Sequence, residues 1–197
     1  MGTRGAFGVY VNDETKVSYN HFDSYPEGLG VSILGELKTM LETWGEANLK
    51  AKAIALRLVD EHGIPCQGDI DEYIKFANIT VGNQTYSDWY CLLRDLQGDL
   101  TMTLQVGVMI DSKNFLEDSL FCEWAYIVNL DSRELEVYQG FQDKPHTKGR
   151  YATIPTFKNI SGSTYYPVAL IATYSFDSLP EAKDFIEKCD PREGGEE

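Results

Sequence analysis

Two β-rich segments near opposite ends of the sequence, with a helical stretch between them, constrain the fold most. Ala6–Val11 and Lys16–Tyr19 are β-prone runs that flank Asn12–Thr15, a polar connection of hairpin length. Phe121–Leu130 and Glu134–Phe141 are rich in aromatic and branched residues and predict a second hairpin. Strands before and after a helical middle indicate an α+β fold with a mainly antiparallel sheet.

The middle of the chain has the spacing of amphipathic helices. Apolar residues recur every three or four positions in Val31–Trp44, which predicts one helix. Asn48–His62 predicts a second helix, with Gly63 as the stop signal. The two would form an αα-hairpin packed against the sheet.

Shorter elements are expected around this framework. Asp69–Ala77 and Asp88–Gln97 predict short helices, whereas the period of Leu100–Ile110 fits a helix or a strand. Tyr166–Phe176 predicts a buried strand, and Pro180–Lys188 predicts a last helix.

Length and composition favour one globular unit. The chain has 197 residues, 43% of them hydrophobic and 24% charged, so we expect a single domain over residues 1–189 and an acidic flexible tail over 190–197. The four cysteines are widely spaced, which predicts no metal site, and no motif implies a cofactor. The start lacks a leader pattern and no apolar run approaches about 18 residues, so we expect a cytoplasmic protein without a membrane partner.

The net charge of −14 limits the partners. A negative mean field repels phosphate backbones, so nucleic acid is not an expected partner. The charge either keeps the protein soluble or forms an acidic surface that binds a basic surface of a host protein.

The densest polar run is Tyr19–Gly30, where a strand gives way to a helix. His21 and Asp23 are two residues apart, so on an extended chain they would face the same side. They are therefore candidate catalytic residues, with His21 moving a proton and Asp23 orienting the imidazole. The candidate ligand-binding residues are Arg4, Asn20 and Tyr25.

Arg4 precedes the first strand and would reach this loop if the hairpin pairs as predicted. Its guanidinium could hold a carboxylate or phosphate, or it could pair with Asp23. The whole loop could equally be a structural clamp held by its own hydrogen bonds. A second, basic stretch, Gln142–Tyr151, is either a solvated loop or a lid that carries cations over an anionic ligand.

Four strings of the sequence resemble a family of bacteriophage and bacterial proteins that has no established activity. They are Thr3–Gly5, Tyr19–Gly30, Asp118–Gly140 and Tyr165–Val168. The resemblance implies a phage-infected or bacterial cell and assigns no residue a role. The order of elements also resembles Ntn-hydrolases, with Thr3 in the place of the nucleophile, but the free amine would require cleavage before Thr3.

These observations lead to three hypotheses. The first is binding or hydrolysis of a small molecule, anionic or nucleotide-like, at the Tyr19–Gly30 loop. The second is an acidic interaction protein without catalysis. The third is an Ntn-hydrolase-like enzyme.

Overall fold

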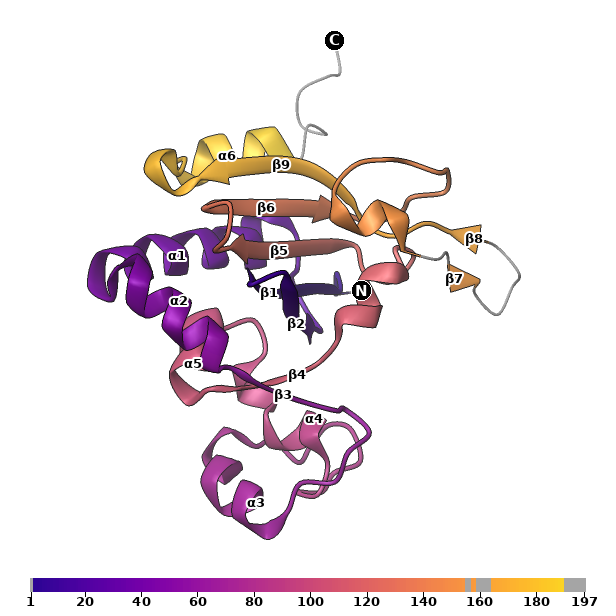
Figure 1. The fold of residues 1–197 in the computed structure, drawn as a ribbon. Helices are drawn as coiled ribbons and strands as arrows, with labels where there is room; N and C mark the ends of the chain where they lie inside the picture. The colour runs from indigo at the N-terminus through magenta and orange to yellow at the C-terminus, as the bar shows by residue number, and fades with distance from the viewer. Residues whose placement is uncertain (1, 155–156, 159–163, 190–197) are drawn as a thin grey trace.

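The computed structural model describes residues 2–154, 157–158 and 164–189. Its centre is a five-stranded sheet in the order β2-β1-β5-β6-β9 (Figure 1). The strand pairs are antiparallel except for β1 with β5, so the predicted α+β class with a mainly antiparallel sheet is confirmed. The strands span Gly5–Val11 (β1), Glu14–Asn20 (β2), Trp124–Asn129 (β5), Glu134–Gln139 (β6) and Ala169–Ser175 (β9).

The first hairpin has a tighter turn than the sequence suggested. β1 and β2 pair up to Val11 and Glu14, so only Asn12 and Asp13 connect them. Their φ angles are 52° and 61°, and two consecutive positive values define a turn whose twist matches a hairpin. Asn and Asp tolerate this region well, which is why the loop has two residues and not four.

Helices cover one face of the sheet, as Figure 1 shows for α1, α2 and α6. The apolar stripe of α1 is buried as predicted, and it packs against Phe7, Trp124 and Tyr126 from the sheet. The helices of this layer span Val31–Thr43 (α1), Gly45–Ala55 (α2), Leu100–Val106 (α5) and Ala182–Cys189 (α6).

The second predicted helix was too long at its carboxyl end. α2 stops at Ala55, and Arg57–Val59 forms a strand, β3, parallel to β4 (Val108–Ile110). Lys16 accounts for the stop, because its buried Nζ lies 3.0 Å from the carbonyl oxygens of both Ile54 and Leu56. A cation satisfies the last carbonyls of a helix, and pairing with β4 then overrides the helical pattern.

The ambiguous segment Leu100–Ile110 contains both candidates, α5 followed by β4. Gly107 separates them, with the positive φ of 80° that ends a helix.

A small lobe lies beside the main sheet and contains α3 and α4, which Figure 1 places away from β5, β6 and β9. Its core includes Trp89, Leu92 and residues of β3 and β4. The two helices predicted here are shorter than expected, and each passes into a 3-10 turn. The elements span Gln67–Tyr73 (α3), Ile74–Phe76 (η2), Trp89–Leu92 (α4) and Arg94–Leu96 (η3).

The face of the sheet opposite the helices is covered by irregular segments and short turns. Ile127 and Tyr138 from the sheet pack there against Leu116 and Tyr151. The covering segments contain Lys113–Glu117 (η4) and Arg150–Thr153 (η5). Phe157–Lys158 (β7) and Thr164–Tyr165 (β8) form a separate two-stranded sheet beyond the end of the main sheet (Figure 1).

The second hairpin is confirmed with one correction. Trp124, Tyr126 and Val128 are buried against the helices, opposite Leu135 and Val137. Phe141, the last residue of the predicted hairpin, does not join this core. It lies beyond the strand end with φ of 56° and is 55% exposed, so the chain has already turned away from the sheet there.

Among the described residues, every helix is too short or too polar to cross a membrane. The predicted tail, residues 190–197, lies outside the part of the chain that the structure describes.

Candidate functional site

The carboxyl ends of three strands meet at one groove of about 790 Å³. His21 follows β2, Asp60 follows β3, and Asp111 follows β4. Because β3 and β4 are parallel, the residues after them emerge at the same edge. The Ser112 backbone N–H donates to the Val17 carbonyl at 2.9 Å and ties this edge to β2. Strand ends of this kind are common positions for ligands.

The groove has a strongly acidic wall. Its described lining contains no lysine or arginine, and the remaining groups are mainly aromatic, imidazole or amide. Asp111 has a cationic partner at the rim, because Lys113 Nζ lies 3.1 Å from its carboxylate. The lining consists of the acids Asp60, Glu61, Asp111, Glu117 and Asp118 together with Tyr19, His21, His62, Tyr90, Ser112, Asn114 and Phe115.

Two buried polar atoms in this wall have no hydrogen-bond partner among the described residues, Ser112 Oγ and Asp118 Oδ1. Burial raises the pKa of Asp118 above its usual value. Unpaired buried polar atoms destabilise a fold, so their presence in a groove wall requires an explanation beyond packing.

His21 contacts Tyr19 on the same strand face. Its Nδ1 lies 2.6 Å from the Tyr19 hydroxyl, and its ring meets Phe22 edge-on. Burial, followed by the positive charges of Arg94 and Arg4, lowers the pKa of His21. Burial also raises the pKa of Tyr19 to about 12, so this hydroxyl keeps its proton at neutral pH. One hydrogen bond thus occupies Nδ1, and Nε2 is the ring nitrogen left for a ligand.

A second groove of about 430 Å³ adjoins the first and shares His21 as a wall. Its character is different, because the guanidinium of Arg94 stands among amide side chains. Arg94 stacks on the rings of Phe22 and Tyr90, with centroid distances of 5.8 and 5.4 Å. The described lining is Asn20, His21, Phe22, Asn78, Arg94, Asp95 and Gln97.

Arg4 lies near His21, as the sequence suggested, since its charge contributes to the lowered pKa of that imidazole. Its guanidinium packs over the Phe121 ring at 4.5 Å, and its backbone N–H donates to Glu123 at 3.3 Å. Arg4 does not line either of these two grooves. Arg4 therefore acts on this region at a distance through its field.

Asp23 and His21 are not brought together as a dyad. The described contacts of the imidazole are with Tyr19 and Phe22. Asp23 has an exposed side chain and a φ of 51°, and its carbonyl accepts the Leu29 N–H at 2.8 Å. The positive φ breaks the extended geometry on which the same-side prediction depended.

Asn20 and Tyr25 hold the shape of the loop. The buried Asn20 Nδ2 donates to the Phe22 carbonyl and to Ser24 Oγ. The Tyr25 carbonyl accepts the N–H groups of Gly28 and Gly30. The structural-clamp interpretation thus describes these two residues well, although Asn20 also lines the second groove.

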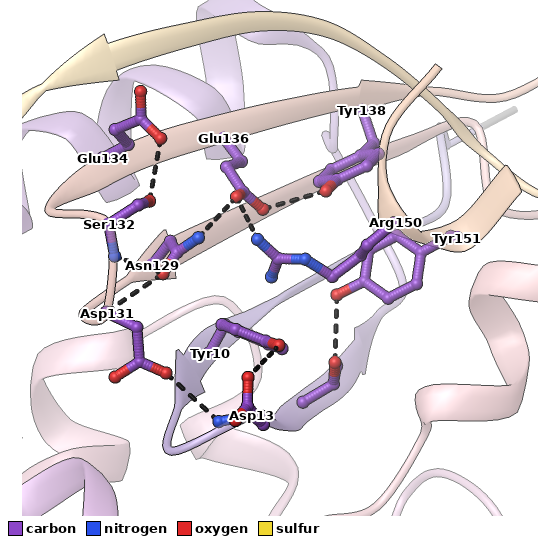
Figure 2. Close-up of polar contacts among 11 residues, drawn as sticks. Tyr10, Asp13, Asn129, Asp131, Ser132, Glu134, Glu136, Tyr138, Arg150 and Tyr151 are labelled. Carbon is purple, nitrogen blue, oxygen red and sulfur yellow. Dashed lines mark hydrogen bonds and ion pairs between the residues drawn. The ribbon is translucent and has the colours of Figure 1, made fainter. Parts of the chain in front are cut away.

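The sheet face that the helices leave uncovered carries a buried polar network around Glu136, which is 3% exposed (Figure 2). Asn129 donates to its carboxylate at 2.7 Å, Tyr138 donates at 2.9 Å, and Arg150 forms an ion pair with it. The Arg150 guanidinium also stacks over Tyr10 at 3.6 Å. Arg150 belongs to the basic stretch Gln142–Tyr151, which was interpreted as a solvated loop or a lid. Its side chain points into the molecule and pairs with Glu136.

Most residues that line the two grooves could not be assigned to a site from the sequence. Asp60, Glu61 and Asp111 follow three-residue strands that were predicted as helix or left unassigned, so nothing indicated that they share an edge. Arg94 lay within a predicted helix. One sequence signal could have indicated these strand ends. At Leu58–Glu61 and Val108–Asp111, a short hydrophobic run is followed directly by acidic residues.

The described residues also bear on possible metal ligands and nucleophiles. No group of three or more His, Cys, Asp or Glu side chains among them is placed to hold a metal ion. Burial raises the pKa of the Cys122 thiol. Thr3 is buried, and its carbonyl accepts the Ser24 N–H at 3.1 Å. The groups available in the two grooves are hydrogen-bond donors and acceptors and fixed charges.

The resemblance to a phage and bacterial family rests on the four strings quoted from the sequence and stays a prediction. Comparison of the chain with protein-family models, curated proteins and solved structures gives no match.

Proposed function

We propose that this protein binds a small organic cation in the acidic groove at the ends of β2, β3 and β4. The observation that carries the proposal is the groove's charge, five carboxylates with no lysine or arginine in its described lining. Tyr19, Tyr90 and Phe115 add aromatic rings, which attract cations at their faces. A volume of about 790 Å³ is within the range typical of small-molecule sites.

The sign of the ligand's charge departs from the expectation based on the sequence. An anionic ligand was expected because Arg4 was placed in the site. With Arg4 stacked on Phe121 and carboxylates along the wall, a positive ligand group is favoured in this groove.

Binding is better supported than hydrolysis at His21. The Tyr19 hydroxyl occupies Nδ1 at 2.6 Å, and no described carboxylate bonds to the ring to orient it as a base. The described contacts of Asp23 also give it no part in orienting the ring. His21 thus acts as a positioning group for the ligand.

Titration calorimetry with cadaverine, a simple diamine, tests the proposal. Glu61→Gln combined with Glu117→Gln removes two charges from the groove, and we expect about 2–30-fold weaker binding because each partly exposed charge contributes roughly 0.2–1 kcal/mol. Glu42→Gln with Glu187→Gln is the matched control, since both acids are exposed on helices remote from the groove lining. Equal losses in both variants, or no binding of any amine, would reject the groove as the site.

A basic surface of a host protein is the second candidate, supported by the net charge of −14. Such a complex would depend on charge spread over the surface, so both double variants would weaken it similarly. Pull-downs at low and high salt separate the candidates, because exposed charges are screened over about 10 Å at 0.1 M salt.

A further inference from the structure

We infer that the ligand is a zwitterion whose cationic end occupies the acidic groove and whose anionic end binds Arg94 in the adjoining groove. The inference rests on the proposed function for the cationic end. It adds the second half of the ligand and assigns Arg94 as the residue that selects for it.

Arg94 differs from three of the other arginines of this acidic protein, and it differs from Arg4, which also lacks an ion pair among the described residues, because it lines a groove. Arg57, Arg133 and Arg150 each form an ion pair with a carboxylate. Among the described residues no carboxylate oxygen lies within ion-pair distance of Arg94, and its guanidinium contacts the neutral Gln97 Oε1 instead. In a chain with 31 acidic residues, an arginine held between aromatic rings without an acid is available for an external anion.

The groove around Arg94 has the donors that an anion needs. Asn78 accepts two hydrogen bonds from Thr80 through its Oδ1, at 2.9 Å from the backbone nitrogen and 2.6 Å from the hydroxyl, so its amide NH₂ remains as a donor. Asp95 also lines this groove and disfavours a ligand that carries negative charge alone. A guanidinium beside an amide NH₂ matches the oxygens of a carboxylate or a phosphate.

The two grooves are connected through shared residues. His21 lines both of them. Tyr90 lines the acidic groove, and the guanidinium of Arg94 stacks on its ring. The carboxylates of one groove and the guanidinium of the other thus share His21 as a common wall. A zwitterionic ligand can pair with both charges, whereas a singly charged ligand can pair with only one.

Calorimetry with matched probes tests the inference. Lysine and cadaverine share the same amine-bearing chain, but only lysine has the carboxylate. We expect lysine to bind the wild-type protein about 10–100-fold more tightly, as a charge-assisted hydrogen-bond pair allows. The pair O-phosphoethanolamine and ethanolamine repeats the comparison for phosphate, and a gain in either pair supports the inference and identifies the anion.

Arg94→Gln should abolish the gain, so that lysine binds no more tightly than cadaverine does, and Arg94→Lys should restore part of the gain, because charge is kept without the planar fork. Unfolding curves of both variants confirm that they fold. The comparison of matched probes on the wild-type protein needs no variant. It therefore tests whether an anionic group tightens binding even if Arg94→Gln is unstable.

Two failures are distinguishable. If no amine binds at all, the proposed function fails together with the inference. If amines bind but neither anionic group tightens binding, or if Arg94→Gln weakens cadaverine and lysine equally, the zwitterion inference alone is wrong.

Discussion

Arg150 and Arg94 are both stacked on tyrosine rings, but their surroundings differ completely. Arg150 meets the buried carboxylate of Glu136, which also accepts from Asn129 and Tyr138 (Figure 2). Arg94 meets a neutral amide at the wall of an open groove. The difference fits a structural role for Arg150, which meets a buried carboxylate, and it is the basis of the ligand-binding role proposed for Arg94, which meets none among the described residues.

The carboxylates divide in the same way. Glu136 receives several donors, whereas Asp118 in the groove wall keeps a buried oxygen without a partner in the described part of the chain. Substitutions should therefore affect stability around Glu136 and binding around His21.

Arg150→Ala should have the largest effect on stability. It leaves Glu136 buried without its cation, and breaking a buried pair typically costs about 3–5 kcal/mol. Denaturant melts measure this loss, and cadaverine affinity should be unchanged in the folded variant. Lys38→Gln, which removes an exposed ion pair with Glu181, is the control and should cost under about 1 kcal/mol. Similar losses for both would show that the Glu136 network is not structural.

Asn20→Ala should have an intermediate effect that bridges the two regions. It removes the donor to Phe22 and Ser24, and a lost buried hydrogen-bonding group costs about 1–3 kcal/mol. His21 follows Asn20 directly, so we also expect weaker binding of cadaverine. Melts and calorimetry on one preparation test both effects, and an unchanged affinity would show that the loop clamp does not position His21.

His21→Gln should change stability at pH 7 by less than about 1 kcal/mol but should change its pH dependence. The lowered pKa means that, below the ordinary histidine value of about 6.5, the unfolded chain binds a proton that the folded protein resists. This position therefore loses stability as pH falls from about 7 through the folded-state pKa. Urea melts between pH 5 and 7.5 should show wild type losing stability relative to the variant, and a constant difference would contradict the lowered pKa.

Asp23→Asn should have the smallest effect. The side chain is exposed, and Asn adopts positive φ at least as readily as Asp, so stability should change by less than about 0.5 kcal/mol. Ligand affinity should also be unchanged. A large loss of binding or of any activity found later would restore the predicted pairing of Asp23 with His21.

The framework of the fold was predictable because long periodic segments carry their own signal. The stripe of α1, the β5–β6 hairpin and the strand β9 follow from residue spacing alone. β3 and β4 were not predictable in the same way, because three-residue strands have too few positions to define a period. Their pairing, together with Lys16 at the end of α2, is a tertiary effect.

Only the site residues that are close together in the sequence could be predicted. His21 and Asn20 stand out in the sequence and do line the grooves. Asp60, Asp111 and Arg94 reach His21 through the parallel pairing of β3 with β4 and through the small lobe, neither of which the sequence pattern indicated. Asp23 was assigned to the same side as His21 on the assumption of an extended chain, which its backbone conformation does not meet.

The parallel contact between β1 and β5 has a consequence for how the protein is made. Gly5 pairs with Trp124, so the central neighbour of the first strand is synthesised more than a hundred residues later. Until then the newly made β1–β2 hairpin has an unpaired edge on its β1 side, a surface on which another chain can add a strand. A nascent chain whose β5 has not yet left the ribosome thus has an incomplete sheet. β1 and β5 can pair only late in translation.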